Sequence, residues 1–123
     1  MSTKRPLIGV VGPCGAGKST LIAGLSRHGY TCRHIAQEHS YVPDMWLRLS
    51  HPDVLIFLNA SYETTVRRRA LNWTMEEYQE QQRRLAHARA HADLIVETDE
   101  LSIEEVLGRV LEFLDGWNKD TKS

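Results

Sequence analysis

The residues most suited to chemistry lie in one glycine-rich segment, GPCGAGKS, at residues 12–19. The segment fits the spacing G-x-x-x-x-G-K-[ST], in which glycines let successive backbone N–H groups turn inward toward phosphate oxygens. Lys18 supplies a positive charge that can reach the β- and γ-phosphates, and the Ser19 hydroxyl can bind magnesium. The segment therefore predicts a phosphate-binding loop, with Ser19 as a metal ligand.

The flanking sequence predicts that this loop joins a strand to a helix. PLIGVV, residues 6–11, is an apolar run of the kind found in parallel strands that are covered on both faces. After the loop, Leu21, Ile22 and Leu25 share one helical face, and Gly29 lies at the expected helix end. A helix that begins near Lys18 directs its positive N-terminus at the loop, which is the context that phosphate binding requires.

Strand and helix patterns alternate along the rest of the chain. Further strands are expected at residues 30–37, at a sheet edge, and at 53–60 and 93–98. A short helix is expected at 43–50, another begins at Ser61, and capping boxes at Thr74 and Ser102 begin the last two. This order predicts an α/β fold with three layers: about four parallel strands, the loop strand near the middle, and helices on both faces. We expect a single domain at residues 1–117 and a flexible tail at 118–123.

Composition narrows the classes of partner. The chain has 123 residues and a formal net charge of −1, so no basic field for nucleic acid is expected. It has no long apolar run and no charged-then-apolar leader pattern, so no membrane partner is expected. Cys14 and Cys32 are too few for a disulfide framework, which predicts a reduced, cytoplasmic protein.

With its strand and helix, the glycine loop resembles the phosphate-binding loop of P-loop NTPases. The resemblance implies a nucleoside triphosphate, ATP or GTP, bound with Mg²⁺. No guanine-selective N-K-x-D element supports GTP, since NKDT at residues 118–121 is out of register. The residues expected to bind the nucleotide are Gly12, Pro13, Cys14, Gly15, Ala16, Gly17, Lys18, Ser19 and Thr20.

The second half of the chain is similar to small nucleoside and nucleotide kinases of the cytidylate kinase and dephospho-CoA kinase type. The similarity rests on PDVLIFLNASYETTVRRR, residues 52–69, and HADLIVETDELSIEEVLGRVLEFL, residues 91–114. It implies that Arg67, Arg68 and Arg69 stand where lid arginines begin, and that residues 98–100 lie near the base. Guanidinium groups there would stabilise the charge that develops on a transferred phosphoryl group. The alternative for each arginine is a solvated helix face paired with nearby glutamates.

The chain departs from these kinases between the first helix and the strand at 53–60. Only residues 30–52 stand where such kinases carry a longer acceptor-binding segment, so few residues are left to bind a nucleotide acceptor. If residues 30–37 form the strand beside the loop strand, Glu38 lies at its carboxyl end, where ligands bind in open parallel sheets. Glu38 is then a candidate for orienting magnesium or for accepting a proton, with Asp44 as the second candidate.

Two functions follow from these expectations. One is a minimal kinase-like protein that binds ATP with magnesium and transfers the γ-phosphoryl group to a small acceptor or to water, with Lys18, Glu38 and an arginine from 67–69 as catalytic residues. The other is a module that binds nucleotide without rapid turnover and signals to a protein partner through QEHSYVPDMW, residues 37–46.

Overall fold

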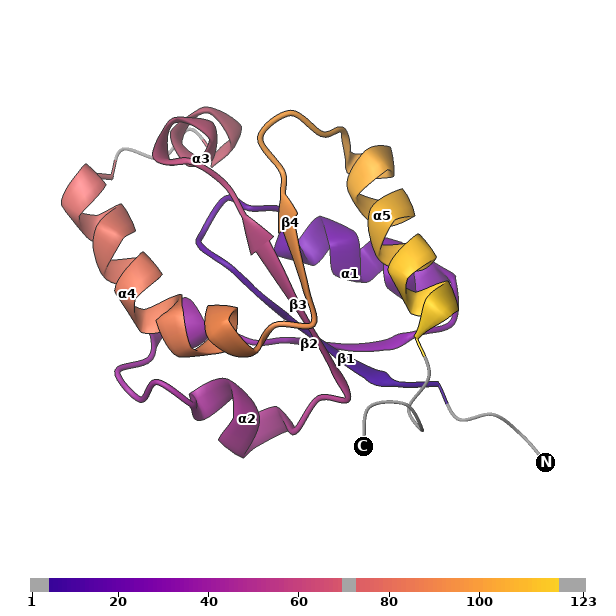
Figure 1. Ribbon diagram of the computed structural model, residues 1–123. Helices are drawn as coiled ribbons and strands as arrows, with labels where there is room; N and C mark the ends of the chain where they lie inside the picture. The colour runs from indigo at the N-terminus through magenta and orange to yellow at the C-terminus, as the bar shows by residue number, and fades with distance from the viewer. Residues whose placement is uncertain (1–4, 70–72, 118–123) are drawn as a thin grey trace.

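An all-parallel sheet of four strands organises the chain in this computed structural model, which describes residues 5–69 and 73–117 (Figure 1). The strand order is β2-β1-β3-β4, which places β1 in the interior and β2 at an edge. The strands are β1 (Leu7–Val11), β2 (Thr31–His34), β3 (Val54–Asn59) and β4 (Leu94–Glu97). The predicted α/β fold with a parallel sheet between helices is confirmed.

Helices cover both faces of the sheet. α1 (Lys18–Arg27) and α5 (Ile103–Gly116) lie on one face, and α2 (Met45–Ser50) and α4 (Met75–His91) lie on the other (Figure 1). Successive strand residues face opposite sides, so Ile56 packs in the core with α1 and α5, whereas Phe57 packs in the core with α2 and α4. Burial on both faces explains why the central strands read as unbroken apolar runs.

The edge strand is shorter than predicted. β2 ends at His34, after which the Ile35 N–H makes one more bond to Val10 O at 3.2 Å. The strand thus stops three residues before its predicted end at 37, and Gln37–His39 form a short 3₁₀ turn, η1. An edge strand has a neighbour on one side only, so the chain is free to leave the sheet as soon as its side chains find other partners. Glu38 therefore lies in a turn beyond the carboxyl end of the strand.

Both predicted capping boxes are present. Thr74 Oγ1 accepts a hydrogen bond from the Glu77 N–H at 3.1 Å, and Glu77 Oε1 accepts one from the Thr74 N–H at 2.8 Å. Ser102 and Glu105 repeat the arrangement at 3.1 and 2.8 Å. The side chains thus satisfy N–H groups that have no partner within the helix, which fixes where α4 and α5 begin.

Replacing Thr74 by alanine should lower the free energy of unfolding by about 1 kcal/mol, because the cap that satisfies the Glu77 N–H is lost. Urea unfolding followed by circular dichroism measures the change. The matched control is Glu76→Ala, since Glu76 lies in the same exposed turn but takes no part in the capping box. Equal losses in the two variants would contradict a specific capping role for Thr74.

The sequence predicted no membrane-spanning segment. Within residues 5–69 and 73–117, none of the helices has the length and apolar character needed to span a membrane. The predicted tail at 118–123 lies outside the described residues, so the boundary at residue 117 stays a prediction.

Candidate functional site

The glycine loop between β1 and α1 has a backbone that requires glycine. Gly12, Gly15 and Gly17 have φ values of 153°, 86° and 99°, in a region that other residues rarely adopt. Gly12 also lies against β3, where a Cβ atom would stand 2.1 Å from Leu58 O. The loop therefore combines a left-handed backbone with a close approach to the neighbouring strand.

Lys18, the first residue of α1, folds its side chain back under this loop. Its Nζ donates hydrogen bonds to Gly12 O at 2.6 Å and Pro13 O at 3.1 Å, and it forms an ion pair with Glu38 Oε2 at 3.1 Å. The residue is only 6% exposed. A buried ammonium group needs such partners because removal from water is costly for an unpaired charge.

Glu38 reaches Lys18 because the sheet brings η1 next to the loop. β2 pairs with β1, so the turn after β2 lies at the same edge of the sheet as the loop after β1. The Glu38 side chain is 3% exposed. Asp44, the second carboxylate candidate, pairs instead with Arg48 on α2 at 2.9 Å. Of the two candidates, Glu38 is the one that the fold places beside Lys18.

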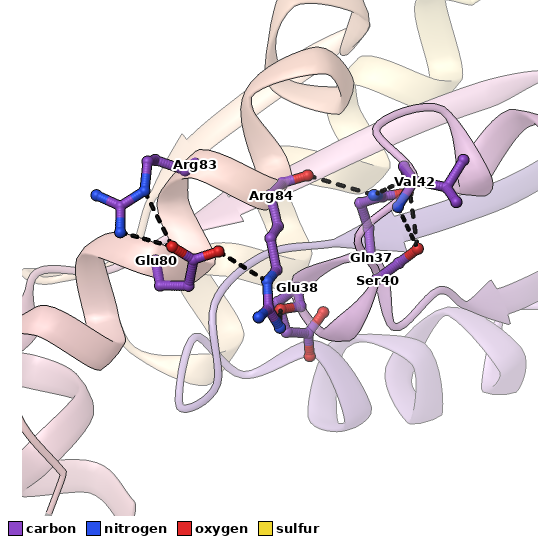
Figure 2. A network of polar contacts seen from close by, with 7 residues as sticks. All are labelled: Gln37, Glu38, Ser40, Val42, Glu80, Arg83 and Arg84. Atoms are coloured by element: carbon purple, nitrogen blue, oxygen red, sulfur yellow. Dashed lines mark hydrogen bonds and ion pairs between the residues drawn. The ribbon is translucent and has the colours of Figure 1, made fainter.

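Contacts with α4 hold η1 in place (Figure 2). Gln37 Nε2 donates to Val42 O at 2.8 Å and to Arg84 O at 3.2 Å. Arg84 donates to the Glu38 carbonyl oxygen at 3.4 Å and to Glu80 Oε2 at 3.1 Å. The position of the Glu38 carboxylate is therefore set by α4 as well as by β2.

Gln81 of α4 is a site residue that the sequence analysis did not identify. Its Oε1 accepts a hydrogen bond from the Cys14 N–H at 3.0 Å, and its Nε2 donates to Cys14 Sγ at 3.4 Å. It thereby occupies one backbone donor of the glycine loop. The available signal was helical spacing, since Gln81, Leu85 and Ala88 form the buried residues of α4, and a glutamine in such a row needs a polar partner.

The loop forms one wall of a cavity of about 700 Å³, within the usual range for small-molecule sites. This wall consists of residues 14–20, which include Lys18 and the exposed Ser19 and Thr20. His34, Glu38 and His39 line it from the side of β2. The wall formed by α3 (Tyr62–Arg69), the turn after β4 and the start of α5 contributes Arg68, Thr98, Leu101, Ser102, Ile103 and Val106.

The three predicted arginines have different positions. Arg68 lines the cavity and donates to Thr98 Oγ1 at 2.9 Å and to Thr98 O at 2.5 Å. Arg67 is not among the residues that line this cavity, and it donates to Thr64 Oγ1 at 3.3 Å. Arg69 is the last residue of α3, and its side chain lies outside the described part of the chain. Among the described side chains, the fold thus brings Arg68 to the cavity.

Asp99 connects the turn after β4 to the start of α3. Its Oδ1 accepts a hydrogen bond from the Ser61 N–H at 2.9 Å. Partial burial pushes the pKa of Asp99 upward, but hydrogen bonds from Ser61 and Thr64 and the nearby Arg68 charge outweigh it, so the pKa lies below its ordinary value. Asp99 is therefore ionised at neutral pH and holds the wall that carries Arg68.

Comparisons with known proteins give a structural similarity and no information about activity. No family model matches the chain, and no curated protein matches it. Among solved structures, the chain is similar to an uncharacterized protein from Eubacterium ventriosum ATCC 27560, with 8% sequence identity and a TM-score of 0.58. The similarity covers 90% of this chain and 99% of that chain. At this identity the likeness concerns the α/β architecture alone.

Proposed function

We propose that this protein binds a nucleoside triphosphate, ATP or GTP, with Mg²⁺ and acts as a minimal P-loop phosphotransferase or NTPase. The observation that carries the proposal is the buried Lys18 ammonium group, held beneath a left-handed glycine loop at the start of α1 and facing a cavity of about 700 Å³. Loop N–H groups and the positive end of a ten-residue helix make this wall attractive to phosphate oxygens.

Lys18, Ser19 and Glu38 each have a role in the proposed chemistry. Lys18 would exchange the carbonyl oxygens of Gly12 and Pro13 for phosphate oxygens, which carry more negative charge. Ser19 and Glu38 fit Mg²⁺, because a hydroxyl and a carboxylate are the oxygen ligands that this ion prefers. The ion would neutralise charge on the phosphates. Glu38 is also placed to accept a proton from the acceptor hydroxyl or from water.

Arg68 would stabilise the charge that develops on the transferred phosphoryl group. It lines the cavity together with the loop, and its hydrogen bonds to Thr98 orient the guanidinium group before any ligand arrives. Preorganised donors of this kind lower the barrier because they need no reorganisation during the reaction. The short segment between α1 and β3 favours a small acceptor or water over a nucleotide acceptor.

A nucleotide-binding module without rapid turnover is the second candidate. It is favoured by the segment that begins with η1. This segment contains Glu38 and, a few residues later, Tyr41, whose side chain is 83% exposed. Because Glu38 pairs with Lys18, phosphate binding at Lys18 changes the contacts of this segment. A protein partner that binds residues 37–46 would then bind the nucleotide-bound and nucleotide-free forms with different affinities. In that case nucleotide binds, but hydrolysis or transfer stays slow.

Calorimetric titration with ATP and with GTP, each with Mg²⁺, followed by turnover assays, tests these candidates. Arg68→Ala should slow turnover by about a hundredfold or more, because a donor to the developing charge is lost. Arg67→Ala is the matched control on the same helix and should change the rate less than about threefold, since Arg67 does not line the cavity.

Three results decide between the possibilities. Equal effects of the two arginine substitutions would contradict the role given to Arg68. Tight binding with negligible turnover would select the module. Failure of both nucleotides to bind would overturn the proposed function in either form.

A further inference from the structure

Cys14, Glu38 and His39 bring a sulfur, an oxygen and a nitrogen atom together on the wall of the cavity. Cys14 Sγ lies 3.8 Å from His39 Nε2, and His39 Nε2 lies 3.7 Å from Glu38 Oε2. All three candidate ligand atoms lie within 4.8 Å of one another. The residues come from two elements, because the loop after β1 and the turn η1 meet at the same edge of the sheet.

Glu38 has a second feature that points to a cation. Its Oε2 pairs with Lys18, but Oε1 is buried and has no hydrogen-bond partner among the described residues. A buried carboxylate oxygen without a partner is costly, and a bound ion or water is one arrangement that would satisfy it. Glu38 also lines the cavity, so a cation that enters from the cavity can reach the carboxylate.

The donor set identifies the kind of cation. Mg²⁺ and Ca²⁺ prefer oxygen ligands, whereas thiolate and imidazole favour Zn²⁺ and related transition metals. A tetrahedral zinc ion, with bonds of about 2.3 Å to sulfur and about 2.0–2.2 Å to nitrogen and oxygen, places its ligand atoms about 3.4–3.6 Å apart. The distances of 3.8 and 3.7 Å that involve His39 need to shorten by only a few tenths of an ångström.

We propose that Cys14 Sγ, the Glu38 carboxylate and His39 Nε2 bind Zn²⁺, with water in the fourth position. On binding, the Cys14 thiol releases its proton to solvent, so a thiolate and a carboxylate together balance the two positive charges of the ion. The site is distinct from the proposed magnesium site in its sulfur and nitrogen ligands, and it shares Glu38 with that site.

Sharing Glu38 makes zinc and nucleotide antagonists. Zinc bound to the Glu38 carboxylate takes away the ligand that the proposed function gives to Mg²⁺, the ion that accompanies the nucleotide. Zinc also immobilises Cys14, whose backbone belongs to the glycine loop. Zinc-loaded protein should therefore bind Mg²⁺–nucleotide weakly. This antagonism rests on the proposed function, whereas zinc binding does not.

Cobalt substitution tests the metal site directly. Co²⁺ added to the full chain should give a sulfur-to-cobalt charge-transfer band and the strong visible bands of tetrahedral cobalt, and Zn²⁺ should abolish both. Cys14→Ser should lose the charge-transfer band, and His39→Gln should weaken zinc binding by about a hundredfold. Cys32→Ser and His28→Gln are matched controls and should behave like the wild-type chain, since neither residue belongs to the cluster or lines the cavity.

Each variant is checked for folding by circular dichroism. The His39 side chain is 59% exposed, so His39→Gln keeps the test valid even if Cys14→Ser fails to fold. Absence of the charge-transfer band in the wild-type chain, or zinc binding by His39→Gln at wild-type affinity, would overturn the site. Loss of the band in Cys32→Ser but not in Cys14→Ser would overturn it as well.

A separate measurement tests the antagonism. ATP and GTP are titrated, with Mg²⁺, into zinc-loaded protein and into protein treated with a chelator that leaves magnesium free. Zinc should lower the nucleotide affinity of the wild-type chain at least about tenfold and leave that of His39→Gln unchanged. Equal affinities with and without zinc would overturn the antagonism. If neither nucleotide binds in any state, the proposed function fails, and the cobalt spectrum still decides the zinc site.

Discussion

Lys18→Ala should reduce the affinity for Mg²⁺–nucleotide by at least about a hundredfold. A charge-assisted hydrogen bond contributes about 1.5–3 kcal/mol, and each 1.4 kcal/mol corresponds to a factor of about ten in affinity. An ammonium group that reaches two phosphates would make more than one such bond. Calorimetric titration of wild-type and variant chains with ATP and GTP measures the loss. Unchanged affinity would contradict the central role given to Lys18.

The same substitution should also destabilise the fold without any ligand. It removes the cation 3.1 Å from a carboxylate whose side chain is 3% exposed. Breaking a buried ion pair from one side costs about 3–5 kcal/mol, because the remaining charge is buried without a partner. Denaturant unfolding should therefore show a large decrease in the free energy of unfolding of Lys18→Ala.

A double variant separates the effect on stability from the effect on binding. Lys18→Met with Glu38→Gln removes both charges and retains much of the side-chain volume, so it should recover most of the lost stability. It should still fail to bind nucleotide tightly, since the positive charge is absent. Recovery of binding together with stability would show that Lys18 acts only as a partner of Glu38, which would contradict the proposal.

Among the glycines of the loop, Gly12→Ala should be the most damaging substitution to the fold. The new Cβ would stand 2.1 Å from Leu58 O, and the backbone at a φ of 153° is unfavourable for alanine. Overpacking and backbone strain cost about 1–3 kcal/mol each, so the free energy of unfolding should fall by about 2–6 kcal/mol. The substitution lowers stability before it affects any ligand, because either β1 and β3 must separate or the loop must move to make room for the new Cβ.

Two other glycines provide controls for Gly12→Ala. Gly17 has a φ of 99°, but a Cβ added there would have no described neighbour within 4 Å, so Gly17→Ala should show strain alone and lose about 1–3 kcal/mol. Gly108 lies inside α5 with open space around it, and Gly108→Ala should raise the stability by about 0.5–1 kcal/mol. Urea unfolding of all three variants gives the order of their stabilities. A Gly12→Ala unfolding midpoint equal to that of Gly108→Ala would contradict the close approach of Gly12 to β3.

The sequence by itself determined the architecture and the position of the loop, because those signals are local. Unbroken apolar runs predicted the central strands, and residues three apart predicted where α4 and α5 begin. The parallel order also placed Glu38 near the loop, although β2 is shorter than expected, since carboxyl ends of parallel strands meet at one edge. The spacing of residues in the sequence is enough to predict contacts within one element and which loops meet at one edge of the sheet.

Only the tertiary structure decided which distant side chains meet. Gln81 contacts Cys14 across 67 residues of sequence, and Arg68 reaches Thr98 across 30. Arg67 and Arg68 are adjacent in sequence, yet only Arg68 lines the cavity, because successive helical residues point about 100° apart. The contact of Cys14 with His39 likewise depends on how η1 packs against α4. Such contacts arise from the packing of whole elements, which short-range spacing does not specify.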